Sequence, residues 1–142
     1  MSEPDDRVEE IEHTADWAIR VRARDVPELF VGAAQGMFGL LTDLSKVSAA
    51  RAFEIDLQAI DAETLLIDWL NELLYLAEEH AVVFAEFAIH RLTVSDDKAE
   101  VRASVRGGRP AELFKAIKAA TFHGVSIRQD VDGFQVELVF DV

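Results

Sequence analysis

Residues 61–79 read DAETLLIDWLNELLYLAEE and carry the strongest helix signal in the sequence. Apolar residues recur there at helical spacing and form one broad face, namely Leu65, Leu66, Trp69, Leu70, Leu73 and Leu76. The opposite face is polar and contains Asp68, Asn71, Glu72 and Glu79. Asp61 is a favourable N-cap, and Glu63 lies in the first turn, where the helix dipole favours an acidic residue. We therefore expect a central helix that packs into the core through its leucine-rich face.

Alternation of apolar and polar residues on both sides of this helix predicts β-strands. It is clearest in DWAIRVRARD (16–25), RAFEIDLQ (51–58), AEVRASVR (99–106) and FQVELVFDV (134–142). Residues 82–93 are strand-like but irregular, and SDDK (95–98) predicts a tight turn, so 82–106 should form a hairpin. Asp132-Gly133 predicts a second hairpin, between HGVSIRQ (123–129) and the last strand.

Two further helices are expected, over PELFVGAAQGMFGLLTD (27–43) and PAELFKAIKAAT (110–121). Glycines at positions 32, 36 and 39 of the first suggest close packing of its backbone. In the second, Leu113, Ile117 and Ala120 should face the core. No repeat or linker divides the chain, so residues 1–142 should form one α+β domain: a mostly antiparallel sheet with three helices covering one side.

The composition limits the classes of function. The chain has 27 acidic and 14 basic residues, for a net charge of −13, which argues against direct binding to nucleic acid. This charge suits a basic partner, a bound cation or a salt-adapted host. There is no cysteine, and no apolar run approaches the ~20 residues that cross a bilayer. The acidic N-terminus is unlike a signal peptide. We expect a soluble, cytoplasmic protein that does not bind membranes.

Acidic groups are predicted to meet where the first predicted strand (16–25) begins and the last one (134–142) ends. Phe134, Val136, Leu138 and Phe140 should face the core, so Asp141 should point to the other face, as should Asp16. If these two ends are neighbours, both side chains and the carboxylate of Val142 converge, and such a cluster needs protons or a cation. Oxygen ligands fit calcium or magnesium, and calcium, which tolerates irregular geometry, is the expected metal. The alternative is that both aspartates are simply solvated strand-end residues.

No pattern of a self-sufficient active site is present. No serine lies in a nucleophile elbow, and the histidines at 13, 80, 90 and 123 do not have metalloprotease spacing. Gly107-Gly108 is not followed by the residues of a phosphate-binding loop.

Four segments and the last residues together resemble the archease family: HTAD (13–16), GMFGLLTDLSKV (36–47), LLIDWLNELLYL (65–76), KAATFH (118–123) and the final FDV. The resemblance implies a non-catalytic accessory protein of an RtcB-type RNA ligase in tRNA splicing. It would promote transfer of a guanylyl group to the ligase, so that the ligase turns over repeatedly. The resemblance also implies that Asp16, Asp141 and Val142 are metal ligands. Two alternatives remain, namely a chaperone-like interaction module for nucleic-acid enzymes and a metal-dependent hydrolase.

Overall fold

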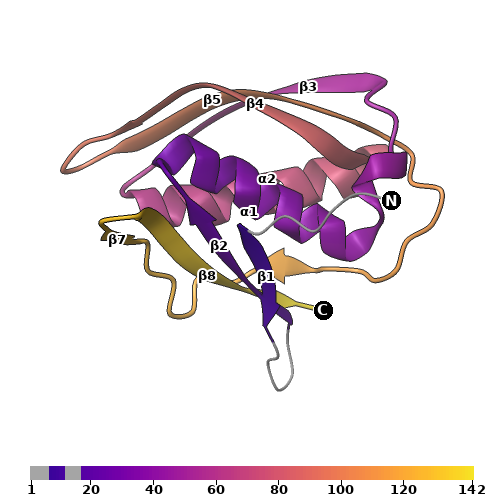
Figure 1. The fold of residues 1–142 in the computed structure, drawn as a ribbon. Coiled ribbons are helices and arrows are strands. Elements are labelled where there is room, and N and C mark those ends of the chain that lie inside the picture. The colour runs from indigo at the N-terminus through magenta and orange to yellow at the C-terminus, as the bar shows by residue number, and fades with distance from the viewer. Residues whose placement is uncertain (1–6, 12–16) are drawn as a thin grey trace.

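The protein is built in three layers, with two helices between two antiparallel sheets (Figure 1). The computed structural model describes residues 7–11 and 17–142. The helices are α1 (Val26–Leu41) and α2 (Ala62–His80), and a short 3-10 turn, η1 (Leu44–Lys46), follows α1. The fold is α+β as predicted. The expected arrangement of helices on one side of a single sheet was wrong, because the helical layer is covered on both faces.

The first layer, which we call the lower sheet, contains β1 (Val8–Ile11), β2 (Trp17–Ala23), β6 (Ala119–Ala120), β7 (Arg128–Asp130) and β8 (Gly133–Asp141). Strand β8 is central, because β2 pairs along one edge of it while β6 and β7 pair along the other. The last strand predicted from the sequence is therefore confirmed. Only the end of the predicted strand 123–129 is regular, as β7.

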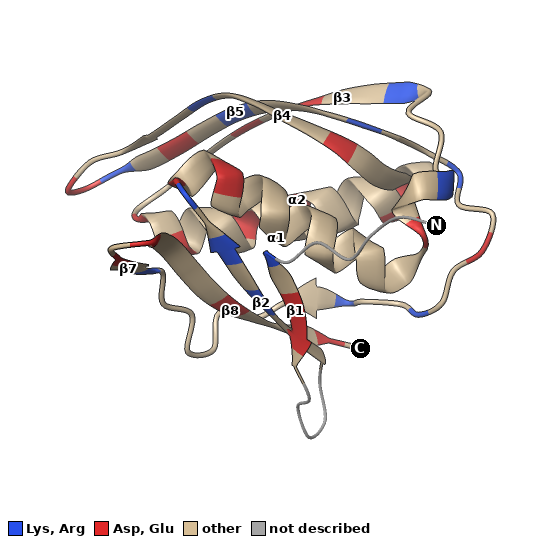
Figure 2. Ribbon diagram, in the orientation of Figure 1, with Lys and Arg blue, Asp and Glu red and all other residues tan. Residues whose placement is uncertain are grey.

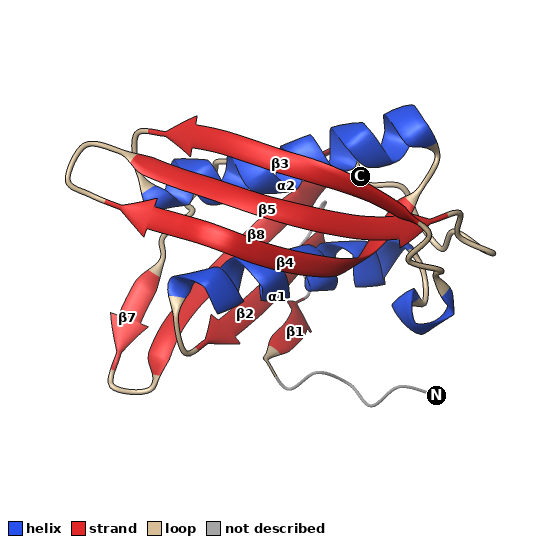
Figure 3. Cartoon of the chain, turned by 90° about the horizontal axis from the view of Figure 1, so that it is seen from above, coloured by secondary structure: helices blue, strands red, loops and turns tan. Residues whose placement is uncertain are grey.

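The second layer, the upper sheet, contains β3 (Arg51–Ala59), β4 (Val83–Val94) and β5 (Ala99–Gly108) in the order β3-β5-β4. Strands β4 and β5 form the predicted hairpin. Acidic positions occur on both sheets and both helices, whereas Lys and Arg positions lie on the strands, η1 and the connections and are absent from α1 and α2 (Figure 2). Seen from above, this sheet lies across both helices (Figure 3).

Helix α2 provides the centre of the core, as its apolar pattern predicted. Trp69 is completely buried, and its indole N–H donates to the carbonyl oxygen of Phe30 on α1 over 3.1 Å. Asp61 is the N-cap and accepts a hydrogen bond from the backbone N–H of Thr64 at 2.8 Å. The cap and the buried indole fix where the helix begins and how it faces α1. Neither of the two described helices is long and apolar enough to cross a membrane.

Two of the three glycines of α1 allow the lower sheet to approach closely. A Cβ added to Gly32 would lie 2.9 Å from Cγ1 of Val21, and one added to Gly36 would lie 2.7 Å from Cδ1 of Ile19. A Cβ on Gly39 would meet nothing within 4 Å. Close packing is thus confirmed at Gly32 and Gly36 and is not the reason for Gly39.

The third predicted helix, 110–121, was wrong. Residues 109–118, which we call the strap, have no regular structure and connect β5 of the upper sheet to β6 of the lower sheet. Its backbone groups bond to other segments: the Phe114 N–H donates to Leu41 O (2.7 Å), and Glu112 O accepts from the Thr42 hydroxyl (2.5 Å). An irregular chain covers about twice the distance per residue of a helix, which suits a connection between layers. Leu113, expected in the core, is 60% exposed.

Candidate functional site at the end of strand β8

The end of β8 is held from both sides. Phe140 pairs with Trp17 of β2 on one edge and with Ala120 of β6 on the other, and Asp141 pairs with Ala119. The backbone N–H of Lys118 donates to the Asp141 carbonyl oxygen over 2.8 Å. The backbone is therefore fixed as far as Asp141, whereas chain ends are commonly loose.

A side chain from the central helix holds β6 in place. The Asn71 amide donates to the Ala120 carbonyl oxygen (3.1 Å), and its carbonyl oxygen accepts from the Ala120 N–H (2.8 Å). Ala120 is only 3% exposed, so these bonds satisfy a buried peptide group. The sequence pattern assigned Asn71 to the polar outer face, and this bracing role was missed. A lone amide among the leucines of α2 was the available signal.

Asp141 presents its side-chain carboxylate to solvent at the end of this anchored strand, and Val142 follows it. Phe140 is completely buried, whereas Asp141 is exposed and Val142 is 46% exposed, so the predicted outward position of Asp141 is confirmed. The Asp141 side chain and the Val142 carboxylate are hard oxygen donors, which is the chemistry that calcium and magnesium prefer. Asp141 and Val142 thus offer the type of oxygen ligand that is found in calcium and magnesium sites.

The complete ligand set lies partly outside the described residues. Asp16 and its neighbour in the sequence motif, His13, belong to the undescribed stretch 12–16. Within residues 7–11 and 17–142, no group of three or more histidine or acidic side chains is placed to hold a metal ion. The pairing of Trp17 with Phe140 confirms that β2 begins beside the end of β8. Convergence of Asp16, Asp141 and Val142 stays a prediction, as does calcium.

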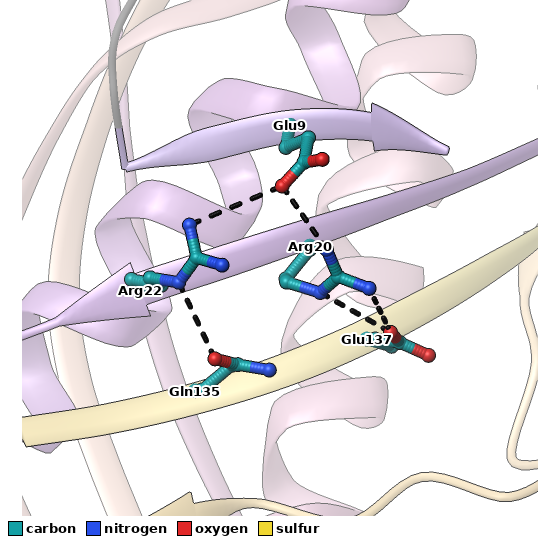
Figure 4. Close-up of polar contacts among 5 residues, drawn as sticks. All are labelled: Glu9, Arg20, Arg22, Gln135 and Glu137. Carbon is teal, nitrogen blue, oxygen red and sulfur yellow. Dashed lines mark hydrogen bonds and ion pairs between the residues drawn. The ribbon is translucent and has the colours of Figure 1, made fainter.

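Next to this end, the outer face of the lower sheet carries a network of charged side chains (Figure 4). The Arg20 guanidinium bonds to Glu137 Oε1 at 2.6 Å and to Glu9 Oε2 at 3.1 Å, which links β1, β2 and β8. The hydrogen bond to Glu137 raises the pKa of Arg20 above its usual value. Arg22 extends the network, since its Nε donates to Gln135 Oε1 over 3.3 Å. These groups neutralise one another at the surface, so the network supports strand register and leaves little charge for a ligand.

A histidine, a serine and a glutamate also meet on the upper sheet. The Ser104 hydroxyl donates to Glu54 Oε1 (2.7 Å), and His90 Nε2 lies 2.7 Å from the same hydroxyl oxygen. Since the single hydroxyl proton goes to Glu54, His90 is the donor in the second bond. A nucleophilic serine needs its histidine as proton acceptor, with the carboxylate behind the histidine. Here Ser104 donates to the carboxylate of Glu54 and accepts from His90, so the cluster is not arranged as a hydrolytic triad.

The sequence matches a known protein family over nearly its whole length. The model of the Archease protein family matches residues 9–142. The chain belongs to the archease family. The protein archease of Methanosarcina barkeri is 34% identical over 148 aligned positions, covering all of both chains. That of Methanopyrus kandleri is 34% identical over 94% of this chain and 98% of its own.

A solved archease-family relative shares the fold. The solution structure of Methanobacterium thermoautotrophicum protein 1598 superimposes with a TM-score of 0.83 at 28% identity, over 96% of this chain and 99% of that one. The resemblance read from the sequence motifs is thus confirmed at the level of the family.

Proposed function

We propose that this protein is a non-catalytic activator of an RtcB-type RNA ligase in tRNA splicing, and that it acts through the end of β8. Family membership supports the partner. The observation that carries the site is the anchoring of Phe140 on both edges and of Asp141 on the β6 edge, which leaves the Asp141 carboxylate exposed on a rigid strand. A preformed site on a regular element keeps its geometry when it meets a partner.

In this proposal Asp16, Asp141 and the Val142 carboxylate are the ligands of a divalent cation, with calcium preferred. When bound, the cation supplies the positive charge that offsets the mutual repulsion of these carboxylates. Strand β8 then positions the carboxylates at the mouth of the ligase, where nucleotide phosphates are held. The rigid strand favours the ligase conformation that accepts the guanylyl group, which allows repeated turnover. The negative net charge of −13 speeds encounter with a ligase surface that attracts RNA.

A ligation assay with substrate in large excess over ligase tests this proposal. Asp141→Asn, which keeps the shape of the side chain and removes its charge, should abolish stimulation of multiple turnover while the protein stays folded. Asp96→Asn makes the same chemical change at an exposed turn between β4 and β5 and should leave stimulation unchanged. Full stimulation by the Asp141→Asn variant would show that the strand end is not the acting site.

The metal is tested separately. Isothermal titration with calcium should give binding that is lost in Asp16→Asn and Asp141→Asn and retained in Asp96→Asn. A Gly-Ser extension after Val142 converts the proposed carboxylate ligand into an amide and should weaken calcium binding. Unchanged calcium affinity in the extended protein would remove Val142 from the ligand set.

A further inference from the structure

The strap covers a cleft at the end of the molecule where α2 stops and β4 begins. The cleft has a volume of about 560 Å³ and is lined by the end of α2, the start of β4 and the strap itself. In Figure 1 the strap is the orange segment that runs from the upper sheet to β6. The backbone N–H of Lys118, one of the lining residues, holds Asp141, but the ligase mechanism proposed above does not use the side chains of this cleft.

Aliphatic side chains form most of the cleft. Ten of its fourteen lining residues are apolar, and none of the fourteen is aromatic. Leu113 on its rim is 60% exposed, and the adjacent Phe114 is 55% exposed. Because the strap backbone is bonded to Leu41 and Thr42, these apolar groups are presented on a fixed support. Apolar groups kept in solvent around a concave surface are typical of a site that binds a partner.

The charged residues of the cleft are mainly basic, in contrast to the chain as a whole. Arg109, Lys115 and Lys118 line it, against Glu78 alone. The strap (109–118) contains three basic residues and one acidic residue, so it carries +2, and removing it from the total of −13 leaves −15 on the remainder. Figure 2 shows the strap with more blue than red positions.

None of the three cations at the cleft has an acidic partner in the part of the chain that the structure describes. Neither Arg109 nor Lys118 forms an ion pair there, and the Lys115 ammonium lies over the ring of Trp17. Unpaired cations around an apolar cleft attract a ligand that combines negative charge with aliphatic groups.

We propose that the strap cleft is a docking site for a short acidic peptide segment of a partner protein, anchored by aliphatic side chains. Leucine-type side chains fill the apolar floor, and flanking Asp or Glu carboxylates meet Arg109 and Lys118. Single-stranded nucleic acid is the less suitable anion, because it is bound by stacking on aromatic side chains, and the cleft lining has none. A second copy of this chain would also present an acidic surface to the basic cleft. Self-association is therefore measured as a separate outcome.

Fluorescence anisotropy with a labelled synthetic peptide of alternating Leu and Glu tests the site without ligase or metal, so its result is independent of the proposed ligase activation. The wild-type protein should bind this peptide at least tenfold more tightly than the same peptide with Lys replacing Glu or with Ser replacing Leu. In nuclear magnetic resonance spectra, the peptide should shift signals of Val82, Leu113 and Ile117.

Matched variants locate the binding. Arg109→Glu should weaken binding about tenfold, while Arg91→Glu, the same change at an exposed position of β4, should alter it less than about twofold. Leu113→Ser should also weaken binding about tenfold, with Val94→Ser, which is 51% exposed on β4, as its control. All four positions are exposed, so circular dichroism should show intact folds.

Several results would overturn the proposal. One is equal affinity for the Glu and Lys peptides, and another is an equal loss of peptide affinity in the variants and their controls. A third is displacement of the peptide by a labelled oligouridylate that binds more tightly. Light scattering that shows a dimer dissociated by Leu113→Ser would assign the cleft to self-association instead.

Discussion

Removal of the Asn71 side chain should loosen the end of β8 indirectly, through β6. Asn71→Ala deletes two hydrogen bonds to the buried Ala120 peptide group, of 3.1 and 2.8 Å. Each is worth about 1 kcal/mol net, with a further penalty for the groups left unsatisfied. The gain in helix propensity from Asn to Ala offsets at most about 0.7 kcal/mol. We therefore expect a loss of about 2 kcal/mol in the free energy of unfolding.

Urea denaturation followed by circular dichroism measures this loss, and amide hydrogen exchange locates it. The amide of Ala120 should exchange faster in the variant, because it donates to Asn71 Oδ1 in the native protein. Glu72→Ala, the next position of α2, is the control and should change the stability by less than about 0.5 kcal/mol. If Asn71→Ala is as mild as Glu72→Ala, the bracing of β6 by Asn71 is wrong.

Three other predictions concern packing, capping and metal. Gly39→Ala should stabilise the protein by about 0.5–1 kcal/mol in thermal melts, whereas Gly36→Ala should destabilise it, because only the second Cβ meets the lower sheet. Asp61→Ala should cost about 1 kcal/mol in urea denaturation at neutral pH. Hydrogen bonds from the Thr64 hydroxyl and N–H lower the pKa of Asp61, so this carboxylate stabilises the fold above its unfolded pKa of about 3.9, and its contribution is lost as the pH falls through the lowered value. Asp61→Asn, which keeps an acceptor, should lack that pH dependence. Calcium at about 100 times its dissociation constant should raise the unfolding free energy by about 2.7 kcal/mol in the wild type and by much less in Asp141→Asn; equal stabilisation of both would contradict the proposed ligand.

Local sequence patterns predicted the elements in which the polarity of each residue matches its buried or exposed position. The leucine face of α2, the Asp61 cap and the alternation of β8 each depend on a short stretch, and each is confirmed. The irregular pattern of β4 has a structural cause, because its register to β5 shifts between Phe84 and Glu86 and again between Ile89 and Arg91. An extra residue at each bulge reverses which side chains face the core, so a strict alternation is not expected there.

Long-range contacts decided the features that the sequence did not predict. The strap has the apolar spacing of a helix, yet Thr42 and Leu41, some seventy positions earlier, bond its backbone instead. Division of the strands into two sheets is likewise a matter of pairing between distant segments, which residue spacing does not encode. At the candidate site, spacing correctly placed Asp141 outward and gave no indication that Asn71 supports it.

The central place of β8 has a consequence for biosynthesis. The lower sheet cannot close until Asp141 has emerged from the ribosome, because β2, β6 and β7 all pair with this final strand. Until then Ile19 and Val21 of β2, which are buried in the finished fold, lack their paired neighbours Leu138 and Val136 on β8. Closure of this layer therefore waits for β8, and a product that stops before this strand would expose apolar residues of β2 to chaperones and proteases. Only molecules translated through Asp141 can acquire both the stable sheet and its acidic tip.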